Sequence, residues 1–276
     1  MNHNLIHFRW LGVGGIELRA SNHTLIVDPY FTRVPFWRVV FGHLHSNHAL
    51  VARHIPRCDF VLVTHSHFDH LMDVPAVVRH TGALVLGSAN ICRLLALSGV
   101  PANHIREIDV GDRLALGDFR VQVLTAGHST FWGWLPFSGP LCPDIRPPLR
   151  ACDYRMDRCL SFLIEVGGHR LLHCPGPPLP ADVLLVKPMG TRLHYESLLH
   201  SVRPQVVIPV HWDDFGRSLS KPVRPMLAPS GRLIPPLRRI DPAQFKHTVE
   251  HAAPETKVLV PRMFHLYDLD ELAQQI

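Results

Sequence analysis

The stretch Thr64-His65-Ser66-His67-Phe68-Asp69-His70 places three imidazoles and one carboxylate within six residues, directly after the apolar run Phe60-Val61-Leu62-Val63. Residues two apart on an extended backbone point to the same side, so His65 and His67 can bind one metal ion where the strand ends. Asp69 and His70, where the chain turns, can face a second ion. A single histidine carries little information in a chain with 21 of them. The whole string after a buried-type strand, however, indicates a metal site.

Two further histidines follow predicted strands elsewhere in the chain. The strand predicted over Phe119–Leu124 leads to His128, and the one predicted over Val206–Val210 leads to His211. Both arrangements repeat the one at His65, in which a potential ligand lies just beyond a strand end. The two halves of the chain therefore each deliver metal-binding side chains to one edge, which predicts a sandwich of two sheets with helices outside.

Helices alternate with these strands. Asp73 and Ser88 are predicted N-caps of two helices, the second of which ends at Gly99, and the strand Ala83–Leu86 lies between them. A further helix is predicted over Leu193–Val202. Two more strands, over Leu160–Val166 and His169–Cys174, are joined by Gly167-Gly168 and form a predicted tight hairpin that ends at Cys174.

The histidine-rich string resembles the signature of the metallo-β-lactamase superfamily of metal-dependent hydrolases. Other segments match, in order and spacing, the broad branch that includes ascorbate-phosphate lactonase and the N-acylphosphatidylethanolamine phospholipase. These segments are Trp10–Gly15, Leu25–Pro29, Ala126–Ser129, Pro188–Gly190 and Ile208–His211. The resemblance spans residues 5 to 215 and implies an αββα sandwich of two mixed β-sheets with helices on the outer faces. It identifies a superfamily and not a substrate.

The resemblance also implies a set of metal ligands. The first site would contain His65, His67 and His128, and the second Asp69, His70 and His211. Most relatives bridge the two ions with an aspartate in a D-x-G turn, whereas this chain has Cys174-Pro175-Gly176. Cys174 is therefore a candidate ligand of the second metal, and its soft sulfur favours zinc over manganese or magnesium. His173 could replace it, or the enzyme could work with one ion. Two zinc ions are expected, with iron or manganese as alternatives.

A zinc site predicts hydrolysis, because zinc lowers the pKa of bound water to roughly 7 and polarises a carbonyl or phosphoryl oxygen. Asp69 is placed to orient that water. The expected substrate is a small ester, lactone, amide or phosphodiester. His194 and Tyr195 are candidates for the substrate-facing loop by resemblance, and Lys187 could bind an anionic group. The alternative for all three is a surface residue without a role in the site.

Two apolar segments interrupt the alternation of strands and helices. Residues 129–159 are rich in proline and aromatic side chains, and Trp132 and Trp134 could hold an apolar substrate group. This segment follows His128, so it is expected to overhang the metals, with an insertion packed on the outside as the alternative. Phe31–Val51 could form a lip of the active site or a helix packed on the core. The core interpretation is favoured because large apolar residues are usually buried.

The composition is that of one globular domain over residues 1–276, with 46% apolar and 18% charged residues. The first residues lack the features of a secretory signal, and the longest apolar stretch, residues 83–100, is too polar and too short to span a bilayer. A cytoplasmic protein is expected. Its six cysteines are interpreted as reduced thiols.

The distribution of charge along the chain limits the kinds of binding partner that the sequence predicts. The net charge of +5 is spread along the chain, so a small-molecule substrate is expected and nucleic-acid binding is not implied. Cleavage of nucleic-acid phosphodiesters stays open as an alternative because of the basic balance. Cys174 keeps open an iron-binding redox protein or a non-catalytic member of the superfamily. The oligomeric state is left undetermined.

Overall fold

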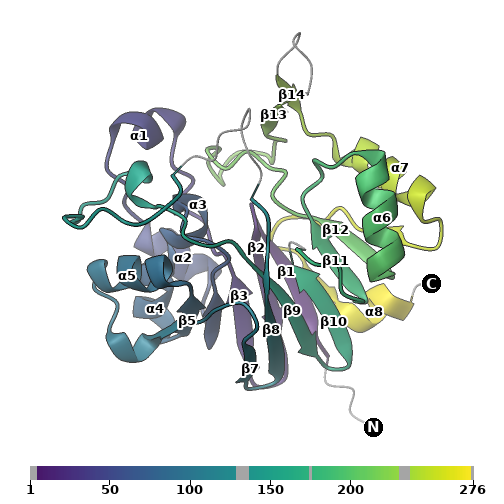
Figure 1. Cartoon of the computed structure of the whole chain (residues 1–276), viewed down its shortest axis with the longest axis horizontal. Helices are drawn as coiled ribbons and strands as arrows, with labels where there is room; N and C mark the ends of the chain where they lie inside the picture. The colour runs from purple at the N-terminus through teal and green to yellow at the C-terminus, as the bar shows by residue number, and fades with distance from the viewer. Residues whose placement is uncertain (1–4, 129–136, 174–175, 230–236, 275–276) are drawn as a thin grey trace.

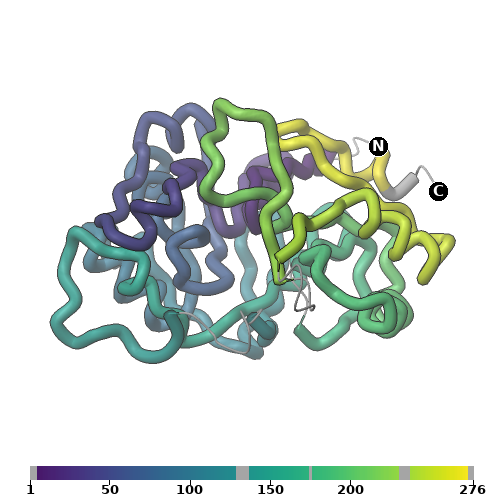
Figure 2. Tube along the Cα trace, turned by 90° about the horizontal axis from the view of Figure 1, so that it is seen from above, coloured from purple at the N-terminus to yellow at the C-terminus, as the bar shows by residue number. Residues whose placement is uncertain are grey.

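The computed structural model describes residues 5–128, 137–173, 176–229 and 237–274. Two seven-stranded sheets lie face to face, and helices cover their outer faces (Figure 1). The N-terminal half of the chain forms one side of the molecule and the C-terminal half the other (Figure 2). The αββα sandwich of two mixed sheets expected from the resemblance is confirmed.

The first sheet combines antiparallel and parallel strands in the order β16-β1-β2-β3-β4-β5-β6. Its strands are β1 (His7–Gly12), β2 (Gly15–Arg19), β3 (Thr24–Val27), β4 (Phe60–Leu62), β5 (Leu84–Gly87), β6 (Ile105–Glu107) and β16 (Leu266–Asp268). From β16 to β3 all neighbours are antiparallel, and from β3 to β6 they are parallel. The parallel strands β3, β4 and β5 therefore end at the same edge.

The second sheet follows the same plan in the order β15-β12-β11-β10-β9-β8-β7. Its strands are β7 (Arg113–Leu116), β8 (Phe119–Thr125), β9 (Leu160–Val166), β10 (His169–His173), β11 (Val183–Val186), β12 (Val206–Pro209) and β15 (Lys257–Val258). A separate ribbon pairs β13 (Leu227–Pro229) with β14 (Leu237–Arg239). Strands β10, β11, β12 and β15 are parallel, so β10, β11 and β12 also end at one edge.

Helices flank both sheets. They are α1 (Phe36–Phe41), α2 (His48–His54), α3 (Phe68–Leu71), α4 (Val74–Thr81), α5 (Ala89–Leu97), α6 (Arg192–Val202), α7 (Pro242–Ala252) and α8 (Leu269–Gln274), with short 3-10 turns at Ala102–His104 and Ala151–Asp153. The predicted N-caps at Asp73 and Ser88 precede α4 and α5 as expected. The Gly167-Gly168 hairpin also forms, with both glycines at positive φ.

Three apolar clusters hold the layers together. One lies between the two sheets and contains Trp10, Phe119 and Phe162, all fully buried. A second joins the first sheet to its helices and includes Val61 and Val77, and the third joins the second sheet to α6 and α7. The sheets are thus buried on both faces, which accounts for the continuous apolar runs of their central strands.

The described part of the segment predicted to overhang the metals, residues 137–159, packs against the N-terminal half, whereas residues 129–136, which directly follow His128, lie outside the described residues. Leu141, Leu149 and Tyr154 are buried in the same cluster as the helices of the N-terminal half. Most of this segment is therefore part of the packed helical layer. Its first described residue, Phe137, lies near a predicted ligand, with its ring centroid 6.5 Å from that of His67.

Phe31–Val51 corrects a second expectation. Phe31 and Val34 are buried, as the favoured interpretation required, but α1 contributes no buried residue. Val39 packs against the core cluster, but the aromatic side chains of α1 lie at the surface, so the core interpretation is wrong for those side chains. Across the described ranges, every helix is too short or too polar to cross a lipid bilayer.

Candidate metal centre

Six potential metal ligands come together at the ends of β4, β8 and β12 and in the short helix α3. The rings of His65, His67 and His128 form a nearly equilateral triangle, with centroids 4.7, 4.9 and 4.8 Å apart. Their ligand atoms all lie within 4.8 Å of one another. His65 and His67 follow β4, and His128 follows β8, so the two sheets each contribute to this group of three nitrogens.

A second group lies beside the first. The Nε2 atoms of His70 and His211 are 3.2 Å apart, and Asp69 Oδ2 lies 3.6 Å from the former and 3.4 Å from the latter. The His65 and His70 ring centroids are separated by only 4.0 Å, which makes the two groups neighbours. The structure therefore assembles the two triads that the resemblance implied.

Local backbone geometry aims these side chains. His67 is the N-cap of α3, so the chain changes there from extended to helical and turns Asp69 and His70 towards the neighbouring position. His211 follows β12 in a left-handed conformation with φ 57°, and its N–H donates to the carbonyl of Val13 at 2.7 Å. Non-glycine residues adopt this conformation at a cost, and such strain concentrates at functional sites.

Asp28, which lies in the matching segment Leu25–Pro29 but was not among the predicted site residues, connects both triads. Its Oδ2 lies 2.7 Å from His70 Nδ1 and accepts from the Thr64 hydroxyl at 2.5 Å, while its Oδ1 accepts from the Thr64 N–H at 2.8 Å. The same Thr64 hydroxyl lies 2.9 Å from His65 Nδ1. With the hydroxyl proton directed at Asp28, the hydroxyl oxygen accepts from the Nδ1–H of His65. One buried carboxylate thus fixes Nδ1–H tautomers in one ligand of each triad and leaves both Nε2 atoms as acceptors.

The protonation states agree with this arrangement. Burial, reinforced by the charge of His70, lowers the pKa of His65 well below its ordinary value, so its ring stays neutral. Burial alone would lower the pKa of His70, but the carboxylates of Asp28 and Asp69 raise it. Burial and then the Lys187 ammonium lower the pKa of His211 to about 4. The Nε2 atoms of His70 and His211 lie 3.2 Å apart, and a cation bound between the two rings would be coordinated by both nitrogens.

The donor atoms fit a divalent metal. Within the described residues, His65 Nε2 is buried and has no hydrogen-bond partner, an expensive state unless a cation binds it. Five imidazole nitrogens and one carboxylate are ligands that zinc, iron and copper accept. Burial alone would raise the pKa of Asp69, but the neighbouring His70 and His211 outweigh burial and lower that pKa. Asp69 therefore stays ionised.

Two other residues predicted for the site, His194 and Tyr195, lie in the first turn of α6. Tyr195 is buried, and its hydroxyl donates to the Lys187 carbonyl at 3.0 Å and accepts from Gly190 N–H at 2.8 Å, so it holds the loop after β11. His194 is exposed on α6 next to Tyr195. Trp132, Trp134 and Cys174 lie outside the described residues.

Sequence comparison identifies the family of the chain. Residues 23–189 match the family model of the β-lactamase superfamily domain, a range that contains Asp28, the histidine-rich string and His128. The chain belongs to this superfamily. The predicted superfamily is thereby confirmed, and so is the coarse assignment of a metal-dependent hydrolase with the metallo-β-lactamase fold.

Individual relatives agree with this assignment. A UPF0173 metal-dependent hydrolase of Symbiobacterium thermophilum is 26% identical over 228 residues, which cover 76% of this chain and 85% of the relative. Igni18, a metallo hydrolase from Ignicoccus hospitalis, has a similar structure with a TM-score of 0.60, 18% identity and coverage of 95% and 97% of the two chains. CmlA, a diiron β-hydroxylase from Streptomyces venezuelae, gives a TM-score of 0.56 at 15% identity, covering 97% of this chain and 55% of CmlA. The last two likenesses concern the fold alone.

Proposed function

We propose that the protein hydrolyses an ester, lactone, amide or phosphodiester bond of a small, partly apolar molecule at a centre that binds two zinc ions. The proposal rests on one observation: two triads of metal-ligand atoms lie side by side, and their tautomers are set for metal binding by Asp28. Zinc bound there would lower the pKa of water to roughly 7 and polarise the oxygen of the scissile group.

Asp69 supplies the protein's own acid–base chemistry in this scheme. Its carboxylate is ionised and only 14% exposed, and its Oδ2 forms a triangle with the Nε2 atoms of His70 and His211, at 3.6 and 3.4 Å from them. An ionised carboxylate accepts hydrogen bonds and donates none, so Asp69 can orient a water molecule by accepting a hydrogen bond from it. It cannot protonate a leaving group at neutral pH.

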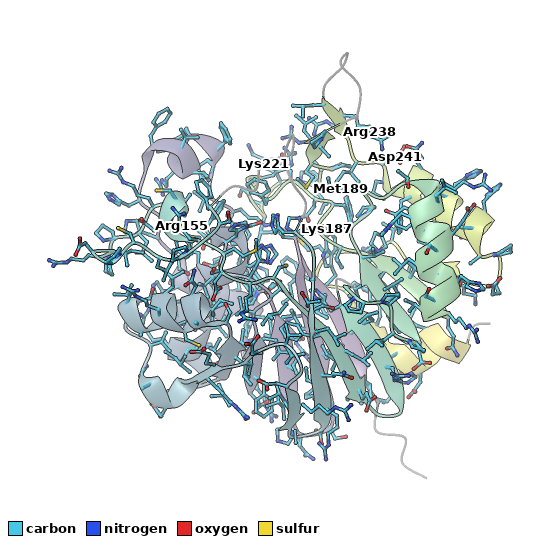
Figure 3. All side chains as sticks on the ribbon, in the orientation of Figure 1. Arg155, Lys187, Met189, Lys221, Arg238 and Asp241 are labelled. Carbon is cyan, nitrogen blue, oxygen red and sulfur yellow. The ribbon has the colours of Figure 1, made fainter. Side chains whose placement is uncertain are left out.

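Lys187 is proposed to hold an anionic group of the substrate. β11 and β12 are parallel neighbours, and the Val210 N–H donates to the Val186 carbonyl at 3.0 Å, so Lys187 and His211 follow adjacent strand ends. In the described part of the chain the Lys187 ammonium has no hydrogen bond or ion pair. Figure 3 shows it in the middle of the molecule, between the helices of the two halves. A half-buried cation beside a metal centre is electrostatically unfavourable unless an anion binds to it.

A cavity next to Lys187 has room for the apolar part of such a molecule. It has a volume of about 300 Å³ and borders the loop that follows Lys187, with Met189, Tyr195 and Phe245 among its lining residues. Arg192, Arg238 and Asp241 also line it, so its charged side chains carry a net positive charge. This mixture of apolar and mainly cationic side chains suits a substrate with an apolar part and an acidic group.

Metal analysis and a substrate panel test the proposal together. The purified protein should contain close to two zinc ions per chain and hydrolyse members of a panel of lactones, aryl esters, N-acyl amides and phosphodiesters. His67→Ala should retain the fold and lose metal and activity. Because the fold is similar to that of a diiron hydroxylase, the purified protein is also analysed for iron. Iron with visible absorbance would favour a redox function over hydrolysis. Zinc-loaded protein inactive on every member would refute the proposed reaction.

A further inference from the structure

Helix α1 exposes an apolar surface that the metal centre does not explain. Phe36, Trp37, Val40 and Phe41 are 75%, 59%, 51% and 81% exposed. At 100° per residue these four side chains share one side of the helix, whereas Val39, on the opposite side, packs on the core. Large exposed apolar patches of this kind mark sites of interaction with another molecule.

The surroundings of α1 are positively charged. Between Asp28 and Asp59 the chain contains no acidic residue. Arg38 is exposed at the border of the apolar side, with its guanidinium carbon 5.2 Å from the centre of the Trp37 ring. The segment paired with the residues after α1, where Arg150 forms a β-bridge with His43, carries Arg146 and Arg150 and also Asp144 and Asp153. Together with Arg38, these groups leave the border of the apolar side with a net positive charge.

The position of α1 determines what can cover it. Figure 1 shows α1 at the periphery of the molecule, away from both sheets. The backbone at Phe36 also lies against Gly216, five residues after His211, so α1 is joined to a loop that begins at the metal centre. A projecting turn of helix with aromatic side chains and flanking arginines is the pattern of a helix that inserts into the boundary of an anionic bilayer.

We infer that α1 docks the protein onto the surface of a membrane that contains anionic lipids. The apolar side chains would insert among the acyl chains, and Arg38 and Arg150 would remain at the level of the phosphate groups. This attachment is peripheral. It would place the metal centre near the membrane, where amphiphilic molecules concentrate.

Flotation with lipid vesicles tests this inference without any requirement for catalysis. The metal-loaded protein is mixed with vesicles of phosphatidylcholine alone or of phosphatidylcholine with phosphatidylglycerol. It should bind the second kind more tightly, and added salt should weaken the binding. Phe36→Ser with Phe41→Ser should reduce binding about tenfold or more, because two apolar side chains no longer insert.

Controls separate this surface from general stickiness. Leu193→Ser removes an equally exposed side chain from α6, in the other half of the molecule, and should bind vesicles as the wild type does. A blue shift of tryptophan fluorescence on binding should disappear in Trp37→Phe. Absence of vesicle binding, or equal binding by the double variant, would overturn the inference. So would a wild-type dimer that the double variant converts to monomer, because that result assigns the surface to a second copy.

Discussion

Replacement of Asp28 by asparagine should reduce zinc affinity. The reduction should be larger than the lower folding stability of the metal-free variant can explain. The buried carboxylate accepts from Thr64 N–H and hydroxyl and from His70 Nδ1–H. An amide has only one acceptor oxygen. Either orientation of the amide therefore directs its NH2 group at a donor, Thr64 N–H or His70 Nδ1–H. When it faces His70, the ring must move its proton to Nε2, the atom that should bind metal.

The expected magnitudes follow from the hydrogen bonds that the amide cannot accept. Removal of a hydrogen-bond partner that orients a metal ligand typically costs about 10–100-fold in metal affinity, or about 1.4–2.7 kcal/mol. The loss of a charge-assisted bond should also lower the stability of the metal-free protein by about 1.5–3 kcal/mol. Zinc affinity is measured by competition with a chromophoric chelator, and stability by urea unfolding of the metal-free protein.

Asp73→Asn is the matched control. Asp73 is also a fully buried carboxylate, and it accepts from the N–H groups of Phe31 and Thr32 and from the hydroxyls of Thr32 and Ser46. None of these donors is a candidate metal ligand. This variant should lose stability and keep its zinc affinity. Equal zinc affinities for Asp28→Asn and the wild type, or an equal loss in both variants, would refute the role assigned to Asp28.

Three further predictions concern other parts of the structure. Lys187→Ala should raise KM for a carboxylate-bearing ester about tenfold or more and leave KM for its neutral analogue unchanged. Lys257→Ala, an exposed control, should change neither KM. Equal effects of Lys187→Ala on both esters would contradict anion binding. Arg33→Met should lower the free energy of unfolding, measured in urea, by about 3–5 kcal/mol. The guanidinium of Arg33 is buried 2.8 Å from the carboxylate of Asp213, which would lose its counter-charge. A near-zero change in the free energy of unfolding would contradict this reasoning. The ring of His54 stacks against those of Phe31 and Phe264, and partial burial followed by the charges of nearby arginines lowers its pKa. Below the ordinary pKa of about 6.5 the unfolded state therefore binds more protons than the folded state, so stability should fall as the pH drops from that value towards the folded pKa. His54→Phe should flatten this fall, and unfolding curves at several pH values that match those of the wild type would contradict it.

The inferred surface of α1 also bears on the substrate. A protein that attaches to a bilayer encounters molecules dissolved in that bilayer at high local concentration. The partly apolar substrate proposed from the cavity beside Lys187 fits this location. The two ideas are nevertheless tested separately, since vesicle binding and hydrolysis have different readouts.

The sequence alone determined the contents of the first half of the metal centre. His65, His67, Asp69 and His70 lie within six residues, so the covalent chain and the change from strand to helix hold them close whatever the rest of the fold does. The predicted strands of each half likewise lead to a potential ligand just beyond their ends, and this repeated order predicted the layered sandwich. These features follow from local spacing and hydrophobic pattern.

Tertiary structure alone decided the features that depend on distant segments. Asp28 contacts Thr64 and His70 because β3 and β4 are neighbours, and no spacing in the sequence expresses that pairing. The pattern of α1 predicted burial, since an apolar helix usually packs inside. In the structure, Val39 packs against the cluster that contains Phe31, Val34 and Leu149, and the aromatic side chains of α1 stay at the surface. Hydrophobic pattern records which side chains avoid water, whereas competition for a limited interior volume decides which of them are buried.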